Sequence, residues 1–387
     1  MSASAARPAT ARALAIGALV EIDAGARANQ VLPGRLAASG LAERDRAFTT
    51  ELVYGTVRMR RACDWLIDRH LRRRLDPEVR AALRIGAYQL AFLGTPAHAA
   101  VSATVAEVAG PARGLVNAVL RRVADALDRG PLRWPDLATE LSYPDWLVGL
   151  LVQDLGEATA RAALVQMNEP AAATRRPDGY TQDLASQQVA RAVHVRPGEV
   201  VVDLCAAPGG KTTAMATTPT AAPGPFVVGV ELDRDRLGRL VDNVAHYGQG
   251  RVALVVADGA RPPLRLGAFD KVLVDAPCSG IGVLRRRPDA RWRIQAADVV
   301  RLAALQRRLL AAAIGLLRPG GLLYYSVCTL TLAETAAIDR WLATTYPDLA
   351  PVLPDLDPTW ERVGRGARLL PQAAGTDGMF LLVLRRT

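Results

Sequence analysis

One stretch in the middle of the chain decides the fold. It is Val200-Val201-Val202-Asp203-Leu204-Cys205-Ala206-Ala207-Pro208-Gly209-Gly210-Lys211-Thr212. The stretch begins as a short run of β-branched residues, which predicts a buried strand. The two glycines allow a tight turn and a close approach of the backbone to a ligand. The pattern therefore indicates a strand that leads directly into a binding loop.

Short apolar runs alternate with helical patterns from this stretch to the end of the chain. We expect strands at residues 200–204, 226–230, 252–257, 271–274, 322–327 and 379–384. The longer helices are expected at residues 234–247, 296–317 and 332–345. This alternation is typical of a parallel sheet with crossover helices. We therefore predict an α/β Rossmann-like domain over residues 180–387.

The sequence before this domain has a different hydrophobic pattern. Residues 9–128 show helical periodicity without a convincing strand, which predicts an all-α domain over residues 1–128. Residues 129–179 hold several prolines around one helical stretch at 146–166 and are expected to form a connector with short helices.

Composition narrows the class of protein. The 387 residues carry a net charge of +10, which favours a polyanionic partner. Apolar runs fall short of the roughly 18 residues that a membrane helix needs, so we expect a cytoplasmic protein without a membrane partner. The four cysteines contain no C-x-x-C pair and lie far from the histidines in sequence, so neither a metal site nor a disulfide framework is expected. We expect a monomer.

Chemically active side chains follow the predicted strands. In an open α/β sheet, ligands lie beyond the carboxyl ends of the strands. Acidic residues and cysteines stand at five such ends, which we list in chain order: Cys205, Glu231, Asp258, Asp275 with Cys278, and Cys328. Each has an ordinary structural interpretation by itself, as a turn former, a helix cap or a small buried side chain. Their joint placement predicts one functional crevice.

A phosphate-binding loop is the main rival interpretation of the glycine turn, because Gly210-Lys211-Thr212 matches the end of a P-loop. That motif needs glycine where Cys205 stands. Pro208 also removes one of the backbone N–H groups that would hold phosphate. The sequence therefore argues against a nucleoside triphosphatase.

The motifs together closely resemble those of the RsmB/NOP (Sun) family of RNA cytosine-5 methyltransferases. The resemblance covers residues 180–387 and rests on these segments: 203–212, Asp275-Ala276-Pro277-Cys278-Ser279-Gly280, Cys328-Thr329, Gln182-Asp183-Leu184-Ala185-Ser186, Arg287-Pro288-Asp289 and Gly375-Thr376-Asp377-Gly378-Met379-Phe380. The helical region is similar to the NusB-type domain that bacterial members carry in front, through residues 45–48, 83–90 and 115–120. That likeness implies a docking role toward RNA or protein.

The resemblance implies S-adenosyl-L-methionine as cofactor and methylation of carbon 5 of a cytosine in RNA, with 16S ribosomal RNA as the expected substrate. It assigns the attacking thiol to Cys328, the release step to Cys278 and support of the base to Asp275. A covalent thiolate adduct is needed because carbon 5 of cytosine is a poor nucleophile. The cofactor site implied by resemblance comprises Cys205, Ala206, Ala207, Pro208, Gly209, Gly210, Lys211, Glu231, Asp258 and Asp275.

An arginine-rich segment follows the Cys278 loop. We predict that Arg285, Arg286, Arg287 and Arg291 contact phosphates and that Trp292 stacks on a base. A cytosine within a helix would have to be flipped out, so a single-stranded or loop target is expected.

Two departures from the family pattern limit what is carried over. Val327 stands where the family usually has threonine, and only about a dozen residues separate Pro170 from Gln182, where family members place a small RNA-contacting subdomain. Two other interpretations therefore stay open. One is a DNA cytosine-5 methyltransferase that uses Cys278 as nucleophile, and the other is an RNA-binding regulatory protein whose methyltransferase half is vestigial.

Overall fold

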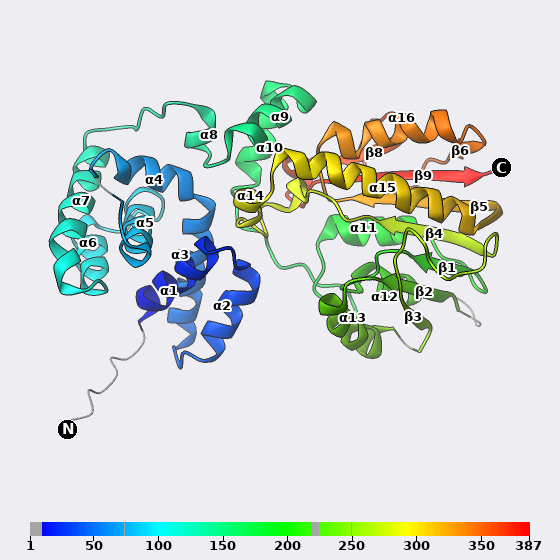
Figure 1. Ribbon diagram of the computed structural model, residues 1–387, viewed down its shortest axis with the longest axis horizontal. Coiled ribbons are helices and arrows are strands. Elements are labelled where there is room, and N and C mark those ends of the chain that lie inside the picture. Colours follow the sequence, from blue (N-terminus) through cyan, green and yellow to red (C-terminus); the bar gives the residue numbers. More distant parts are fainter. Residues whose placement is uncertain (1–9, 73, 218–223, 249) are drawn as a thin grey trace. The chain divides into compact units, whose positions relative to one another are not determined.

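The computed structural model describes residues 10–72, 74–217, 224–248 and 250–387. The chain forms two compact units, which are described separately (Figure 1). The helical unit comprises Met1–Val148 together with Arg287–Arg293, and the sheet unit comprises Gly149–Arg286 together with Ile294–Thr387. The first nine residues of the predicted all-α domain lie outside the described residues.

The helical unit is built from helices alone in its described part, as the periodicity predicted. Its helices are α1 (Ala11–Asp23), α2 (Ala28–Ala37), α3 (Glu43–Arg58), α4 (Arg60–Asp68), α5 (Pro77–Ala91), α6 (Ala97–Ala106), α7 (Gly110–Asp128), α8 (Leu137–Glu140) and α14 (Ala290–Arg293). Helix α5 is central, with every residue from Ala81 to Gln89 buried. A methyl group added at Gly86 would lie 2.4 Å from the Leu120 side chain, so glycine lets α5 and α7 pack closely.

A segment from much later in the chain completes this unit. Arg291 is fully buried, with its guanidinium 3.9 Å from the centre of the Tyr143 ring. It donates hydrogen bonds to the carbonyls of Arg58 (3.2 Å) and Ser142 (3.1 Å). The chain thus leaves the sheet unit after residue 286, packs among the helices and returns at residue 294. The helical unit also continues past the predicted boundary at residue 128, through α8 to residue 148.

The described residues of the sheet unit form nine strands. They are β1 (Val200–Asp203), β2 (Phe226–Glu231), β3 (Val252–Val256), β4 (Phe269–Asp275), β5 (Leu317–Val327), β6 (Leu349–Pro351), β7 (Glu361–Val363), β8 (Gly366–Leu369) and β9 (Met379–Arg386). Their order is β3-β2-β1-β4-β5-β9-β8-β7, and β6 also pairs with β9. The pairs among β1 to β5 are parallel, and the pairs that involve β6 to β9 are antiparallel. The six predicted strands are confirmed, and β6, β7 and β8 were not anticipated.

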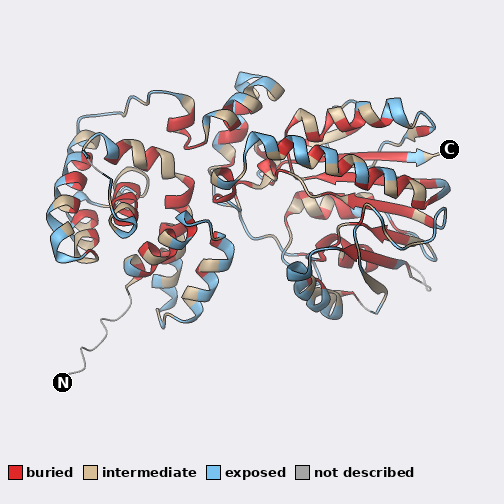
Figure 2. Ribbon diagram, viewed as in Figure 1, coloured by how far each residue is buried: buried red, intermediate tan, exposed pale blue. Residues whose placement is uncertain are grey.

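Helices cover both faces of the sheet. Alternate strand residues separate into two cores, so that Val202 packs with α15 (Ala296–Leu316) and α16 (Ala336–Thr345), while Val201 packs with α11 (Leu184–Ala192) and α12 (Gly210–Ala216). Figure 2 shows the strands buried between these layers. The unit also contains α10 (Glu157–Gln166), α13 (Arg234–Tyr247), α17 (Pro371–Ala374) and the 3₁₀ turns Ile281–Val283 and Leu332–Glu334. Helix α9 (Asp145–Leu155) spans the boundary between the units.

Two helix predictions need correction. The stretch predicted as one helix at 146–166 is divided into α9 and α10 by Gly156, whose φ of +80° no helix accommodates. The helix predicted at 332–345 begins with a separate 3₁₀ turn, and α16 starts only at Ala336.

Replacement of Arg291 is expected to destabilise the helical unit. Arg291→Ala leaves the buried carbonyls of Arg58 and Ser142 without these donors and removes the contact with Tyr143, so the free energy of unfolding should fall by roughly 2–4 kcal/mol. Arg129→Ala is the matched control, because Arg129 is an exposed arginine of the same unit. Its effect should stay within about 0.5 kcal/mol. Urea denaturation measures both, and equal losses would contradict the buried role of Arg291.

Candidate active site

The strand order brings the loops after β1, β4 and β5 to one edge of the sheet. Strands β1 and β4 are neighbours at the point where the winding direction of the sheet reverses, which is where open α/β sheets form a crevice. In the parallel pair β4–β5, Asp275 lies beside Ser326. The loops that carry Cys278 and Cys328 therefore start side by side.

The two cysteines that the sequence singled out meet at this edge. Their Sγ atoms are 3.3 Å apart, and neither cysteine is in a disulfide. The hydrogen bond to Cys328 and burial both raise the pKa of Cys278 well above its ordinary value. Cys278 is therefore held as a neutral thiol that can donate a proton toward Cys328. The two thiols are chemically unequal although they are adjacent.

Lys211 brings a positive charge close to the two cysteines. Its Nζ lies 2.7 Å from the Asp275 carboxylate, and its side chain is 9% exposed. Burial alone would lower the pKa of Lys211, but the charge of Asp275 and its hydrogen bond outweigh burial, and Cys328 adds to them, so the pKa is raised. Because this electrostatic effect is mutual, the ammonium favours the thiolate form of Cys328.

The loop after β1 is held in place by helix α13 and by the residue at the end of β2. Gly209 adopts φ +103° just before α12, and a side chain there would meet Leu240 of α13 at 3.0 Å. Ala206 and Ala207 also pack on Leu240. The backbone N–H of Ala207 donates to Glu231 (3.0 Å), which anchors the loop to the end of β2. The loop is therefore fixed in place with its glycine turn at the crevice.

Acidic side chains stand at the ends of three strands around this loop. Glu231, after β2, is 6% exposed and accepts hydrogen bonds from the backbone N–H groups of Ala207, Leu232 and Asp233. Asp258, after β3, is exposed, and Asp275 is partly exposed beside Lys211. Asp258 and Asp275 thus expose carboxylate oxygens that can accept hydrogen bonds or attract a cation, whereas the oxygens of Glu231 hold the backbone of the loop.

Sequence reasoning missed a residue that joins the two cysteine loops. Glu334 is fully buried and accepts hydrogen bonds from the backbone N–H (2.8 Å) and hydroxyl (2.5 Å) of Ser279, which follows Cys278. It also accepts from the hydroxyl of Thr329 (3.2 Å), which follows Cys328. The hydroxyl of Thr331 and the side-chain amide of Gln306 also donate hydrogen bonds to Glu334. The signal in the sequence was the hydroxyl residue after each cysteine, because two such donors need a shared acceptor when buried.

Close backbone contacts also join the two cysteine loops to the segment before β9. Gly282 donates its N–H to the carbonyl of Cys328 (3.0 Å), and its own carbonyl accepts from the N–H of Gly378 (2.8 Å). A methyl group at Gly282 would lie 2.2 Å from the Gly378 carbonyl oxygen. Three loops therefore approach at a point where no side chain fits.

The arginines predicted to contact RNA mostly make protein contacts instead. Arg285 is buried and donates to the carbonyls of Gly375 and Pro170. Arg286 bridges the carboxylates of Asp183 (2.5 Å) and Asp377 (3.0 Å), so it links two of the sequence motifs. The prediction for these residues needs correction, because their guanidinium groups are used to hold loops together.

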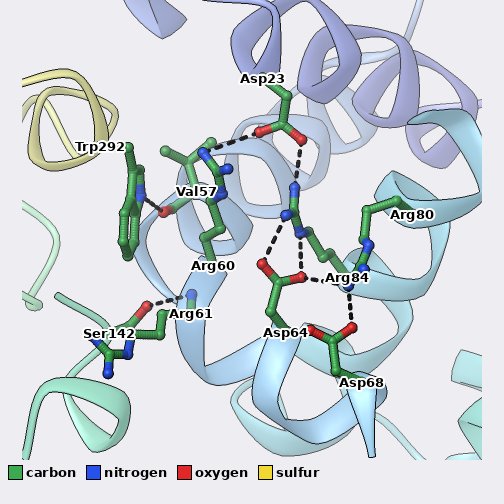
Figure 3. Close-up of polar contacts among 10 residues, drawn as sticks. All are labelled: Asp23, Val57, Arg60, Arg61, Asp64, Asp68, Arg80, Arg84, Ser142 and Trp292. Atoms are coloured by element: carbon green, nitrogen blue, oxygen red, sulfur yellow. Dashed lines mark hydrogen bonds and ion pairs between the residues drawn. The ribbon is translucent and has the colours of Figure 1, made fainter. Parts of the chain in front are cut away.

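The remaining residues of that segment differ from one another. Arg291 was predicted to bind RNA and is fully buried in the helical unit, so that prediction is wrong. Arg287 is exposed and stays a candidate for phosphate contact. Trp292 is partly buried and donates its Nε1–H to the carbonyl of Val57 (2.7 Å), and the guanidinium of Arg60 lies over its ring (Figure 3).

The described residues also bear on metal binding and on membrane insertion. In the described part of the chain, no group of three or more His, Cys, Asp or Glu side chains is arranged to hold a metal ion. Among the same residues, no helix has both the length and the apolar character needed to cross a membrane.

Substitution of Glu334 is expected to disturb both cysteine loops. Glu334→Ala removes the acceptor of the buried Ser279 backbone N–H and one shared acceptor of the hydroxyls of Ser279 and Thr329, so the free energy of unfolding should fall by roughly 2–4 kcal/mol. Glu334→Gln keeps the shape and one acceptor oxygen and should cost less than half as much. Asp298→Ala serves as control, because Asp298 caps the exposed start of α15. Urea denaturation compares the three, and a loss for Glu334→Ala no larger than for Asp298→Ala would refute the role of the buried carboxylate.

Known proteins resemble the chain over nearly its whole length. It is 36% identical to ribosomal RNA small subunit methyltransferase B of Thermus thermophilus, with 98% of each chain covered. It is 38% identical, over 93% of each chain, to a protein of Mycobacterium tuberculosis that is named only as a methyltransferase. The crystal structure of the protein PH0851 superposes with a TM-score of 0.77 at 22% identity, covering 97% of this chain and 99% of that one, which shows a shared fold.

Family comparisons agree with the division into two units. Residues 9–125 match the NusB family, and residues 190–385 match the family described as 16S rRNA methyltransferase RsmB/F. The second match spans the crevice with both cysteines, the glycine turn and the three carboxylates. The chain therefore belongs to the RsmB/F family of methyltransferases and carries a NusB domain in front of the methyltransferase domain.

Proposed function

We propose that this protein methylates carbon 5 of a cytosine in 16S ribosomal RNA, with S-adenosyl-L-methionine as methyl donor and Cys328 as covalent nucleophile. The observation that carries the proposal is the contact between Cys278 and Cys328, 3.3 Å apart, beside the Lys211–Asp275 ion pair. A single thiol would allow attack on the base, and a second, unequal thiol supports a separate release step.

The residues at the crevice fit the proposed cofactor. The positive φ of Gly209 turns the backbone from the loop after β1 sharply into α12. The carboxylates of Glu231 and Asp258 are suited to accept hydrogen bonds from ribose hydroxyls or an amino group. When bound, S-adenosyl-L-methionine supplies an electrophilic methyl group on a positively charged sulfur. The acidic row at the strand ends is electrostatically compatible with that charge.

Different side chains of the crevice can carry out the separate steps of the reaction on the base. The Cys328 thiolate, favoured by Lys211, adds to carbon 6 of cytosine, and the electron pair displaced from the double bond makes carbon 5 nucleophilic. We assign to Asp275 the acceptance of a hydrogen bond from the cytosine amino group while charge develops. After methylation, carbon 5 loses its proton to a base, the double bond re-forms and the sulfur of Cys328 leaves with its bonding electrons. We assign assistance of this release to Cys278.

The choice of RNA rests on similarity to named proteins. The relatives from Thermus thermophilus and Erwinia tasmaniensis are both named ribosomal RNA small subunit methyltransferase B, and each covers more than nine-tenths of this chain. The short connection between Pro170 and Gln182 distinguishes this chain from the usual family pattern. We therefore propose the same RNA for it and leave the particular cytosine open.

Two other functions predict different behaviour of the cysteines. A DNA cytosine-5 methyltransferase would use Cys278 as nucleophile, although its pKa is raised by the hydrogen bond to Cys328 and by burial. A regulatory RNA-binding protein would need neither thiol. The intact pair, its ammonium neighbour and the Glu334 network favour an enzyme in which Cys328 attacks.

Cysteine substitutions test the proposal. With a 16S rRNA transcript that contains 5-fluorocytidine, the unmodified protein should form a covalent complex that withstands denaturing electrophoresis, because fluorine at carbon 5 blocks release. Cys328→Ala should form none. Cys278→Ala should accumulate the complex even on ordinary RNA, because attack proceeds and release is slowed. Cys63→Ala is the control, since Cys63 is buried in the helical unit.

Several outcomes would overturn the assignment. Loss of the complex in Cys278→Ala together with its retention in Cys328→Ala would reverse the two roles and favour the DNA interpretation. Absence of a complex in all proteins, with no binding of S-adenosyl-L-methionine by calorimetry, would favour the regulatory interpretation.

A further inference from the structure

A cavity of about 230 Å³ lies within the helical unit. It is formed by the end of α1, the junction of α3 and α4, helix α5 and the inserted segment 287–293. Its lining residues are Leu19, Ile22, Asp23, Ala24, Gly25, Thr56, Val57, Arg60, Arg84, Asp289, Trp292 and Arg293. Asp23, Ala24, Gly25 and Arg293 are exposed, so the cavity opens to solvent.

One wall of this cavity is flat and aromatic. The Nε1–H of Trp292 is engaged by the Val57 carbonyl, which fixes the orientation of the ring. The guanidinium of Arg60 lies 5.5 Å from the centre of that ring. Leu19 and Ile22 are buried and supply apolar surface. A planar group that entered would contact an immobilised aromatic ring and a planar cation.

Polar groups in the cavity have hydrogen-bonding capacity left over. The Thr56 hydroxyl is buried, with its residue 1% exposed, and it has no hydrogen-bond partner among the described residues. Arg60 pairs with Asp23 at 3.4 Å, which is too long for a good hydrogen bond. Arg84 takes the other oxygen of Asp23 and both oxygens of Asp64 (Figure 3). Thr56 and Arg60 are therefore the groups that a ligand could satisfy.

Size and charge limit what the ligand can be. A cavity of about 150 Å³ can hold a benzene molecule, so this cavity suits one somewhat larger ring. Its lining carries three arginines and two aspartates, and Asp64 from outside the lining pairs with Arg84, so the local charges balance. The attraction for an anionic ligand therefore comes from the net charge of +10 on the chain. A planar, polar ring attached to an anionic chain satisfies all of these conditions. RNA bases outside a helix have this chemistry and are recognised by stacking on aromatic rings and guanidinium planes.

We propose that this cavity binds one unpaired base of the RNA substrate, stacked on Trp292, with the polar edge of the base toward Thr56 and Arg60. The inference rests on the proposed function, because it takes RNA as the substrate. It assigns to the helical unit a specific base-binding site in addition to any general attraction of phosphates. It also gives the inserted segment 287–293 a role in substrate recognition.

Photo-crosslinking of the full chain tests the site directly. The probe is a 16S rRNA transcript substituted with 5-iodouridine, which crosslinks to aromatic side chains in contact with the base. After irradiation and digestion, the crosslinked peptide should contain Trp292. This measurement uses the unmodified protein, so it does not depend on whether any variant folds. Crosslinks to other peptides alone would overturn the proposal.

Matched variants measure the contribution of the ring. Trp292→Ala should raise the Kd for the unsubstituted transcript roughly 5-fold to 100-fold, because stacking on an aromatic side chain is lost. Trp292→Phe loses the hydrogen bond to Val57 but keeps a ring, so its Kd should stay within about twofold. Thr56→Val removes a hydroxyl that has no partner within the described protein and should raise Kd several-fold. Arg129→Ala, an exposed arginine outside the cavity, is the control.

The outcomes separate this site from the proposed chemistry. If Cys328 forms its adduct but Kd is the same for Trp292→Ala as for Arg129→Ala, the base site is overturned and the chemistry stands. If Trp292 crosslinks but no Cys328 adduct forms, the base site is supported and the chemistry fails. If Trp292→Phe weakens binding as much as Trp292→Ala, the indole affects binding through its hydrogen bond to the Val57 carbonyl, and stacking on a base is overturned.

Discussion

The parallel pairing of β4 with β5 is the constraint on which the rest of the site depends. Its register sets Asp275 beside Ser326, and the two loops that follow therefore leave the sheet together. Glu334 then fixes these loops by accepting hydrogen bonds from the residue after each cysteine. A shift of one strand by two residues would keep every side chain on its face of the sheet and still separate the two sulfur atoms.

The electrostatics of the crevice follow from this geometry. Two neighbouring thiols without a charged neighbour would both stay neutral at physiological pH. Here the ammonium of Lys211, itself held by Asp275, lies close enough to Cys328 for each to influence the ionisation of the other. The neutral Cys278 thiol completes the arrangement by its hydrogen bond to Cys328. Unequal roles for identical side chains thus arise from their different neighbours.

Much of the fold and of the candidate site could be predicted from the sequence, because the strands and the motifs that follow them are local patterns. Short apolar runs located six of the strands in the described residues, and Cys278, Cys328, Lys211 and Asp275 lie close together. Glu334 escaped notice because a glutamate near the start of a predicted helix is usually exposed. Arg291 was misjudged because its burial depends on Tyr143 and on carbonyls far away in the sequence. Strands β6, β7 and β8 have three or four residues each and contain a single β-branched residue among them, Val363, so no strand pattern marked them.

The central claim is that this family member methylates carbon 5 of a cytosine in 16S rRNA. The most direct measurement is to incubate the protein with a 16S rRNA transcript and methyl-labelled S-adenosyl-L-methionine, digest the RNA to nucleosides and identify the labelled nucleoside by mass spectrometry. The account predicts label in 5-methylcytidine, and none when Cys328 is replaced by alanine. Label in any other nucleoside, or label that persists without Cys328, would contradict it.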